Sequence, residues 1–331
     1  MNYTPEYAVY AGVSLTKMTS PSPLPRHLAI AIILCLGSGF AANHVSARVA
    51  FDAGTGLLAA ILFRAGLSFI TLLWYLIWTK HSLHLPKKLA KWQLTLGVLI
   101  CLQSLCIFSA VARIPVAIAL LVANTFPILL AFLTWALGGP KPSRHSLIIM
   151  GVIFFGLIWV LDLPTWWIQS TTLDKNWYAG LSFALGAACC FSFALWITEH
   201  KLGLVSGPVR SLYTIAIVLF IIVILALSGT VENSTQLPHN QKGWVALILL
   251  GVLYTLSFIG LFVFAPKLNM ATNSPAMNIE PVTSLFLAWI VLDQTFSLNQ
   301  LFGGAIVLFG IISLAYLNST VKNKSIKRID S

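Results

Sequence analysis

Apolar runs of about twenty residues recur along the whole 331-residue sequence, separated by short polar links. A helix of about 20 residues, rising about 1.5 Å per residue, is long enough to cross the hydrocarbon core of a bilayer. Only 9% of the residues are charged and 58% are hydrophobic, whereas roughly a quarter of the residues of a soluble protein are charged. These features exclude a soluble or disordered chain and predict an all-α integral membrane protein.

Ten such runs predict ten transmembrane helices. The predicted spans cover residues 28–49, 57–79, 91–112, 115–137, 145–163, 177–199, 206–229, 243–265, 270–292 and 298–318. Residues 1–27 are expected to form a cytoplasmic tail without a cleavable signal, because they contain no apolar core. Residues 319–331 are expected to form a basic cytoplasmic tail. The links between spans are too short to hold a soluble domain.

The distribution of basic residues predicts the orientation of the chain. With the amino terminus inside, fifteen of the 20 Lys and Arg residues fall on the cytoplasmic side, four fall outside, and Arg64 lies within a span. Short cytoplasmic loops carry such an excess. We therefore expect a multi-pass protein of the bacterial inner membrane with both termini cytoplasmic. The net charge of +11 is then a topology signal, and the bilayer rather than nucleic acid is the expected partner.

The two halves of the chain resemble each other at an offset of 154 residues. At this offset Asn124-Thr125-Phe126-Pro127 falls on Asn278-Ile279-Glu280-Pro281, and Phe155-Gly156 falls on Phe309-Gly310. Matched Asn, Pro and Gly residues indicate a duplication. The predicted repeats are residues 28–163 and 177–318. Each repeat would hold five spans, and an odd number reverses the second copy in the membrane. Such inverted repeats are a known way to build alternating access around a site near the midplane.

Four segments resemble motifs of one family, the EamA-type members of the drug/metabolite transporter superfamily. The segments are Leu36-Gly37-Ser38-Gly39-Phe40-Ala41, Ile61-Leu62-Phe63-Arg64, Glu280-Pro281-Val282 and Ser297-Leu298-Asn299-Gln300-Leu301-Phe302-Gly303. The resemblance implies ten helices in two inverted five-helix halves, and a carrier that moves a small polar metabolite, such as an amino acid, outward. The chain departs from the family at Gly139 and Gln294, where glutamates usually stand, so no role is carried over for those acids.

Glu280 is the strongest candidate for a functional residue. It lies about ten residues into the ninth predicted span, roughly 15 Å deep and close to the midplane. An ionisable group at that depth costs about 2.5–3.5 kcal/mol by insertion scales. Glu280 is thus a candidate proton carrier or a contact for a substrate ammonium group. A purely structural Glu280 would instead cap backbone freed by Pro281 or pair with a fixed arginine.

Two further ionisable residues lie within spans. Arg64 is too deep for its head group to be comfortable in lipid, and a role inside the bundle with a carbonyl or an anion is expected, including a substrate carboxylate. His44, in the outer half of the first span, titrates near neutral pH in its unperturbed form. A histidine satisfied by core contacts is an equally good interpretation of His44.

Uncharged polar residues complete the candidate set. Thr283 and Ser284 share the helix face of Glu280. The candidate pathway residues are Gln103, Ser104, Tyr254 and Ser257, although interhelical hydrogen bonding explains them equally well. Asn124 and Asn278 recur in both halves and are interpreted as mainly architectural, since Glu280 is matched by Phe126.

The sequence favours a carrier over other functions. No phosphate-binding glycine loop is present, the acidic residues are scattered singly, and the five cysteines lie in apolar stretches. We therefore expect no catalytic residues, cofactor, disulfide or metal site. The prediction is a secondary transporter, an exporter with a small-molecule substrate and with protons as the candidate coupling ion. The alternatives are a passive channel or facilitator and, less favoured, a multipass membrane enzyme. The solute, the direction of transport and the oligomeric state stay open.

Overall fold

Helices account for all the regular structure in the computed structural model over the residues that it describes, which are 24–139, 141–160, 175–203, 205–231, 233–264 and 279–327. The helices are α1 (Arg26–Asp52), α2 (Leu57–Trp78), the short 3-10 helix η1 (Lys87–Leu89), α3 (Ala90–Val111), α4 (Val116–Ala123), α5 (Phe126–Ala136), α6 (Arg144–Val160), α8 (Lys175–His200), α9 (Gly207–Ser228), α10 (Gln241–Phe264), α12 (Ile279–Leu292) and α13 (Leu298–Lys327).

The predicted class of integral membrane protein is confirmed by the length and composition of these helices. Within the described part of the chain, seven helical segments are long and apolar enough to cross a membrane. Three shorter apolar helices fall in the fifth, ninth and tenth predicted spans. They are Leu147–Gly156, Ile279–Leu292 and Leu298–Gly310. The all-helical class is therefore confirmed, whereas the count of ten crossings stays a prediction.

The fourth predicted span consists of two helices rather than one. Helix α4 ends at Ala123 and α5 begins at Phe126. Pro127 has no N–H to donate, and in a continuous helix its ring would clash with the carbonyl of Ala123, four residues earlier. The side chain of Asn124 donates to the Leu120 carbonyl at 2.8 Å. This bond satisfies backbone at the break, in line with the architectural interpretation of Asn124.

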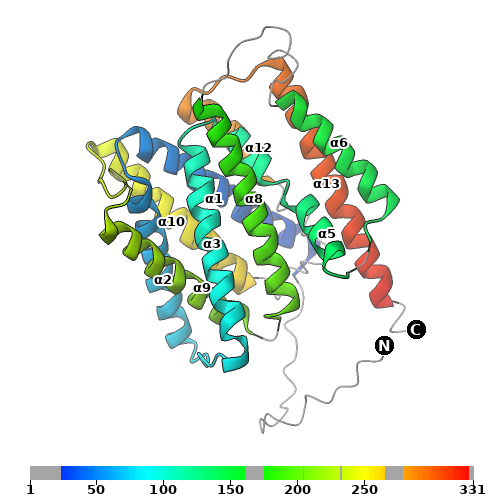
Figure 1. The fold of residues 1–331 in the computed structure, drawn as a ribbon, viewed down its shortest axis with the longest axis horizontal. Helices are drawn as coiled ribbons and strands as arrows, with labels where there is room; N and C mark the ends of the chain where they lie inside the picture. Colours follow the sequence, from blue (N-terminus) through cyan, green and yellow to red (C-terminus); the bar gives the residue numbers. More distant parts are fainter. Residues whose placement is uncertain are drawn as a thin grey trace.

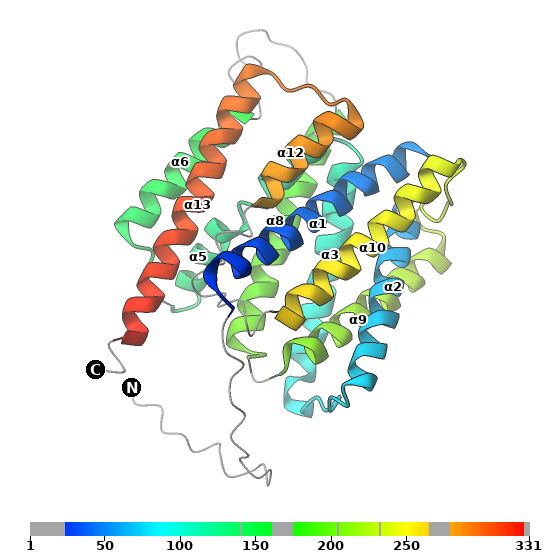
Figure 2. The same cartoon turned by 180° about the vertical axis from the view of Figure 1, so that it is seen from behind.

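Helix α13 extends past the end predicted for the tenth span. It continues to Lys327, so the first nine residues of the expected basic tail, from residue 319, continue the last helix. Helices α6 and α13 lie side by side, next to the larger bundle formed by the other helices (Figures 1 and 2).

Close helix contacts repeat at the offset found in the sequence. Gly97 of α3 packs against Ile217 of α9, where an added Cβ would lie 2.6 Å from the Ile217 side chain. Gly251 of α10 packs against Phe63 of α2, with the corresponding distance 3.0 Å. Both members of the first pair lie 154 residues from members of the second. The duplication thus relates packing contacts as well as residue letters.

Helices α6 and α13 are themselves equivalent at the offset of 154, so the contact between them should contain each pair of residues twice. An added Cβ at Gly156 would meet Val307, and one at Gly310 would meet Ile153. Exchanging the halves also turns the α1–α10 contact into α8–α3 and the α2–α10 contact into α9–α3. A two-fold exchange of the repeats therefore describes these contacts among α1, α2, α3, α6, α8, α9, α10 and α13.

Equivalent helices of the two halves run in opposite directions. At one end of the bundle the α1–α2 turn meets the α9–α10 link, where Gly56 N–H donates to Gln236 O at 2.9 Å. At the other end the α2–α3 link meets the start of α9, where the Tyr213 hydroxyl donates to Leu83 O at 2.8 Å. Helix α1 ends at the first of these ends, and its equivalent α8 ends at the second (Figure 1).

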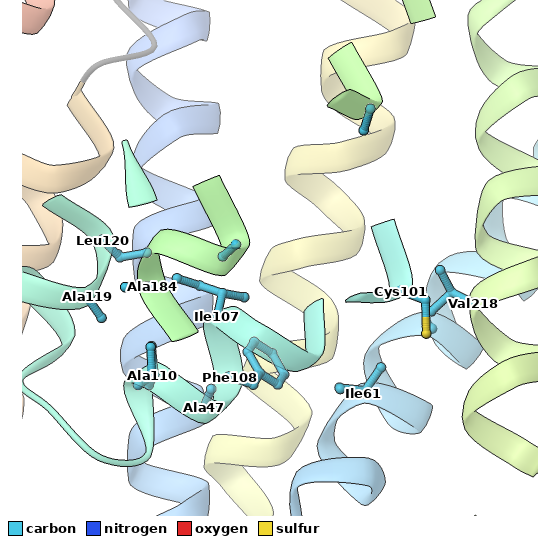
Figure 3. Packing of buried hydrophobic residues seen from close by; sticks show 14 of the residues in the cluster. Ala47, Ile61, Cys101, Ile107, Phe108, Ala110, Ala119, Leu120, Ala184 and Val218 are labelled. Carbon is cyan, nitrogen blue, oxygen red and sulfur yellow. The ribbon is translucent and has the colours of Figure 1, made fainter. Parts of the chain in front are cut away.

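A large buried apolar cluster joins the helices of the two halves. Figure 3 shows part of it, with Ile107 and Phe108 of α3 near residues of α1, α4 and α8. Among the described residues, Phe108 is the largest of the fully buried side chains. It stands at the edge of the polar residues that form the candidate site.

Candidate functional site

A group of charged, polar and aromatic side chains lies inside the bundle and is contributed by both halves. We call it the central cluster. Its members are His44 (α1), Arg64 (α2), Ser104 and Phe108 (α3), Tyr254 (α10) and Glu280 (α12). The structure thus brings together five of the residues singled out in the sequence, namely His44, Arg64, Ser104, Tyr254 and Glu280.

The guanidinium group of Arg64 packs against two aromatic rings. Its guanidinium carbon lies 4.5 Å from the ring centroid of Phe108 and 4.3 Å from that of Tyr254. Its Nη2 donates to the Ser104 hydroxyl at 2.8 Å, and the residue is 5% exposed. Cation–π contacts strengthen when water is excluded, to about 2 kcal/mol or more. Arg64 therefore faces the bundle as expected, but its partners are rings and a hydroxyl rather than the predicted carbonyl or anion.

Arg64 forms no ion pair with a carboxylate in the described part of the chain. Arg48 and Asp52 form an ion pair there, and His44 lies 3.7 Å from Glu280. Buried charges are usually paired, because an isolated charge away from water is costly. A buried, rigidly held cation without a carboxylate partner is a suitable contact for an anionic group of a solute.

His44 and Glu280 meet across the contact between α1 and α12. The His44 Nε2 and Glu280 Oε1 atoms are 3.7 Å apart, with side-chain exposures of 11% and 21%. The His44 ring also packs edge-on against Phe108, with centroids 5.9 Å apart. Phe108 therefore touches both His44 and Arg64. The partner of Glu280 is this histidine and not the fixed arginine considered from the sequence.

A hydroxyl pair forms a second polar contact between the same helices. Ser38 Oγ of α1 and Thr283 Oγ1 of α12 are 3.1 Å apart. Ser284, the other hydroxyl predicted on the Glu280 face, is fully buried and donates to the Pro281 carbonyl at 2.8 Å within its own helix. Thr283 thus belongs to the α1–α12 contact, whereas Ser284 is used inside α12.

The two predicted asparagines are not joined to the central cluster by any contact among the described residues. Asn124 is bonded within the α4–α5 break. Asn278 lies outside the described residues. No geometry therefore joins this pair to the cluster.

Three buried polar atoms around the cluster have no hydrogen-bond partner among the described residues. They are Arg64 Nε, His44 Nδ1 and Asn43 Oδ1. The amide nitrogen of Asn43 donates to Leu250 O of α10 at 2.7 Å, which fixes the orientation of that side chain. Buried polar atoms are normally bonded to protein or water. Unused donors and acceptors on buried side chains are suited to water or a polar solute.

Sequence reasoning missed three residues at this site, namely Phe108, Asn43 and Ser38. Asn43 is an amide within an apolar run next to His44, and that polarity was a usable signal. Ser38 stands in the quoted Gly37-Ser38-Gly39 segment. Phe108 is one of 20 phenylalanines in the chain, and nothing in the sequence distinguishes it from the others.

Comparison with known proteins places the chain in a family. The EamA-like transporter family matches residues 27–162 and, a second time, residues 173–316. The chain belongs to the EamA-like transporter family. The resemblance to the drug/metabolite transporter superfamily is therefore confirmed, together with its two-repeat architecture. An EamA-like protein is a multi-pass membrane transporter, so the bilayer and a small-molecule substrate are its partners, and the family consists of transporters rather than enzymes.

A solved structure shows that the EamA-like chain shares an observed fold. It is described as "Crystal structure of protein", has 17% sequence identity and a TM-score of 0.59, and the alignment covers 89% of this chain and 100% of that chain. At this identity the likeness concerns the fold alone. A comparison with curated protein sequences returns no match.

Proposed function

We propose that this chain is a secondary transporter that exports small polar metabolites, such as amino acids or related compounds, by alternating access. In this proposal ten spans form two inverted five-helix repeats in the bacterial inner membrane, with both termini in the cytoplasm. Family membership supports the word transporter. The opposite directions of α1 and α8 support the inversion, and the excess of basic residues supports the orientation.

The central cluster carries the proposal, because both repeats contribute to it. The first repeat supplies His44 and Arg64, and the second supplies Tyr254 and Glu280. In transporters built from inverted repeats, the substrate site lies at the interface of the repeats near the midplane. A rocking motion of one repeat against the other would therefore open and close contacts at this cluster.

The chemistry of the cluster fits a solute that carries both an acidic and a basic group. Among the described residues, Arg64 has an unpartnered Nε–H and no ion pair with a carboxylate, so it suits a carboxylate of the solute. Glu280 suits an ammonium group once His44 moves away. The rings of Phe108 and Tyr254 hold Arg64 in place, and a fixed cation binds with a smaller loss of side-chain freedom.

Glu280 and His44 also support a role for protons. Both side chains can take up a proton, and they lie 3.7 Å apart at a contact between helices of different repeats. A solute ammonium that displaces His44 from Glu280 would break this contact. Proton release or uptake at the pair would then accompany the change of access.

Flux measurements on purified protein in proteoliposomes test the proposal. A panel of amino acids is offered with an imposed pH gradient, and counterflow of labelled solute is measured without the gradient. Wild-type protein is expected to show saturable counterflow and gradient-driven flux. In Glu280→Gln, gradient-driven flux is expected to fall at least about tenfold, while Glu199→Gln, a change at an exposed acid at the end of α8, keeps it.

Each assay isolates one part of the proposal. Undiminished gradient-driven flux in Glu280→Gln would refute the role of Glu280 in coupling. If the wild type shows flux that does not saturate and no counterflow, the protein is a passive channel and the carrier proposal is refuted.

A further inference from the structure

Two lysines converge on tryptophans where α3 begins and α8 ends. Lys201 Nζ lies 5.2 Å from the ring centroid of Trp92 and 5.4 Å from that of Trp196, and Lys91 Nζ lies 5.6 Å from the centroid of Trp92. We call these four residues the lysine–tryptophan site. Because both lysines lie against Trp92, their ammonium groups are at most 10.8 Å apart, the sum of their distances to that ring.

The positive charge of this site is not compensated by the described residues. Neither lysine takes part in an ion pair there. The segments that meet at this end, residues 79–91 and 197–210, contain six Lys and Arg residues and a single acid, Glu199. Like charges held near one ring repel each other, and an anion between them would relieve the repulsion.

A stripe of exposed apolar side chains leads away from the site along each of the two helices. On α3 the stripe is Leu94, Val98 and Leu102, and on α8 it is Phe193, Cys189 and Leu185. Residues four apart lie on one helix face, and Lys91 and Trp196 continue the two stripes. Helices α3 and α8 pack side by side, on the face of the bundle turned toward the viewer in Figure 1 and away in Figure 2.

We infer that the lysine–tryptophan site binds the phosphate headgroup of an anionic phospholipid whose acyl chains lie along the exposed stripes of α3 and α8. A phosphate diester is an anion that accepts hydrogen bonds from ammonium groups, and tryptophan favours the level of the headgroups in a bilayer. Basic pockets between membrane helices bind such headgroups. A free phosphate ion shares the charge chemistry but makes no use of the apolar stripes, so the site is assigned to lipid.

Lipid titration of the delipidated, full-length protein by native mass spectrometry tests this assignment. Phosphatidylglycerol and phosphatidylcholine are compared as ligands. The wild type is expected to bind phosphatidylglycerol more tightly. Each lysine near the surface contributes about a fivefold gain, so Lys91→Gln/Lys201→Gln should lose about 30-fold in affinity for this lipid, and each single variant should lose about fivefold.

Lys141→Gln is the matched control, because Lys141 lies 5.6 Å from the ring of one tryptophan, Trp135, outside the site. It should keep the preference of the wild type. An equal loss in Lys141→Gln, or an unchanged preference in the double variant, would refute the site. Displacement of the lipid by inorganic phosphate at equal concentration would assign the pocket to the free ion and also refute the lipid assignment. Circular dichroism is expected to be unchanged in all variants.

Discussion

The interface of α1, α2 and α10 and its duplicate, formed by α8, α9 and α3, share a packing pattern and differ in chemistry. The first holds Arg64 against Tyr254, a Ser68–Thr255 hydroxyl pair at 2.8 Å, and the amide of Asn43 on Leu250 O. In the second interface, the offset of 154 replaces each of these three pairs by apolar residues. In the same order, the pairs are Val218 with Ile100, Ile222 with Cys101, and Ile197 with Leu96. Figure 3 includes Val218 and Cys101 within the buried apolar cluster.

This difference separates the scaffold from the site. Gly97 and Gly251 give both interfaces the same close approach of helices, so packing does not require the polar residues. The ionisable groups gather where the first interface meets α12. The offset of 154 matches Arg64 with Val218, Glu280 with Phe126 and His44 with Thr198, so none of the three has an ionisable duplicate. The two interfaces thus share one packing scaffold and differ in polar chemistry, since the second holds a different polar contact, in which Gln93 of α3 donates to the Thr214 hydroxyl of α9 at 2.9 Å.

The largest expected effect comes from placing an arginine at Val218, the position of the second interface that is equivalent to Arg64. Val218 is 4% exposed and surrounded by apolar side chains. In Val218→Arg the new cation has no pair of aromatic rings to lie between, and a loss of about 3 kcal/mol or more in stability is expected. Monodisperse protein recovered in detergent should fall sharply, while Val218→Leu is recovered normally. Normal recovery of Val218→Arg would show that the second interface also accommodates charge.

Removing the charge from the first interface should leave the fold intact and abolish transport. Replacing a buried charge by an apolar residue of similar volume is often neutral or stabilising, so Arg64→Met should melt within a few degrees of the wild type. Its flux in proteoliposomes should fall at least about tenfold. Arg64→Lys should also transport poorly, because lysine lacks the planar group that stacks between Phe108 and Tyr254. If Arg64→Met transports at the rate of the wild type, the proposed role of Arg64 in the transport site is refuted.

The shared scaffold predicts smaller, matched losses of stability. An added methyl at Gly97 or Gly251 meets Ile217 or Phe63, and overpacking of this kind costs about 1–3 kcal/mol. Both alanine variants should therefore melt at lower temperature than the wild type, with Gly97→Ala the more affected. Gly66→Ala is the control, since nothing lies within 4 Å of its added Cβ, and a gain of up to about 1 kcal/mol is expected. A loss at only one of the two glycines would argue against equivalent packing.

The sequence predicted the helices and the repeat because both leave a direct signal in the order of residues. Apolar runs mark the membrane helices, and Asn, Pro and Gly residues reveal the offset of 154. The contact of His44 with Glu280 was not predicted, because the pattern of one helix does not say which neighbour it faces. The break at Asn124 was also missed, although Pro127 was visible, since apolar periodicity outweighed the backbone constraint of proline.

The α1–α12 contact gives the most direct test that the central cluster is the transport site. In a chain whose five cysteines are replaced by alanine, Thr283→Cys puts a thiol beside Ser38, and Ser284→Cys puts one at the adjacent, fully buried position. The account predicts that a membrane-impermeant thiol reagent modifies the Thr283→Cys protein from either face of the membrane, that transported solute slows both reactions, and that Ser284→Cys stays unreactive. Modification only by a lipid-soluble reagent would place Thr283 in lipid and contradict the account.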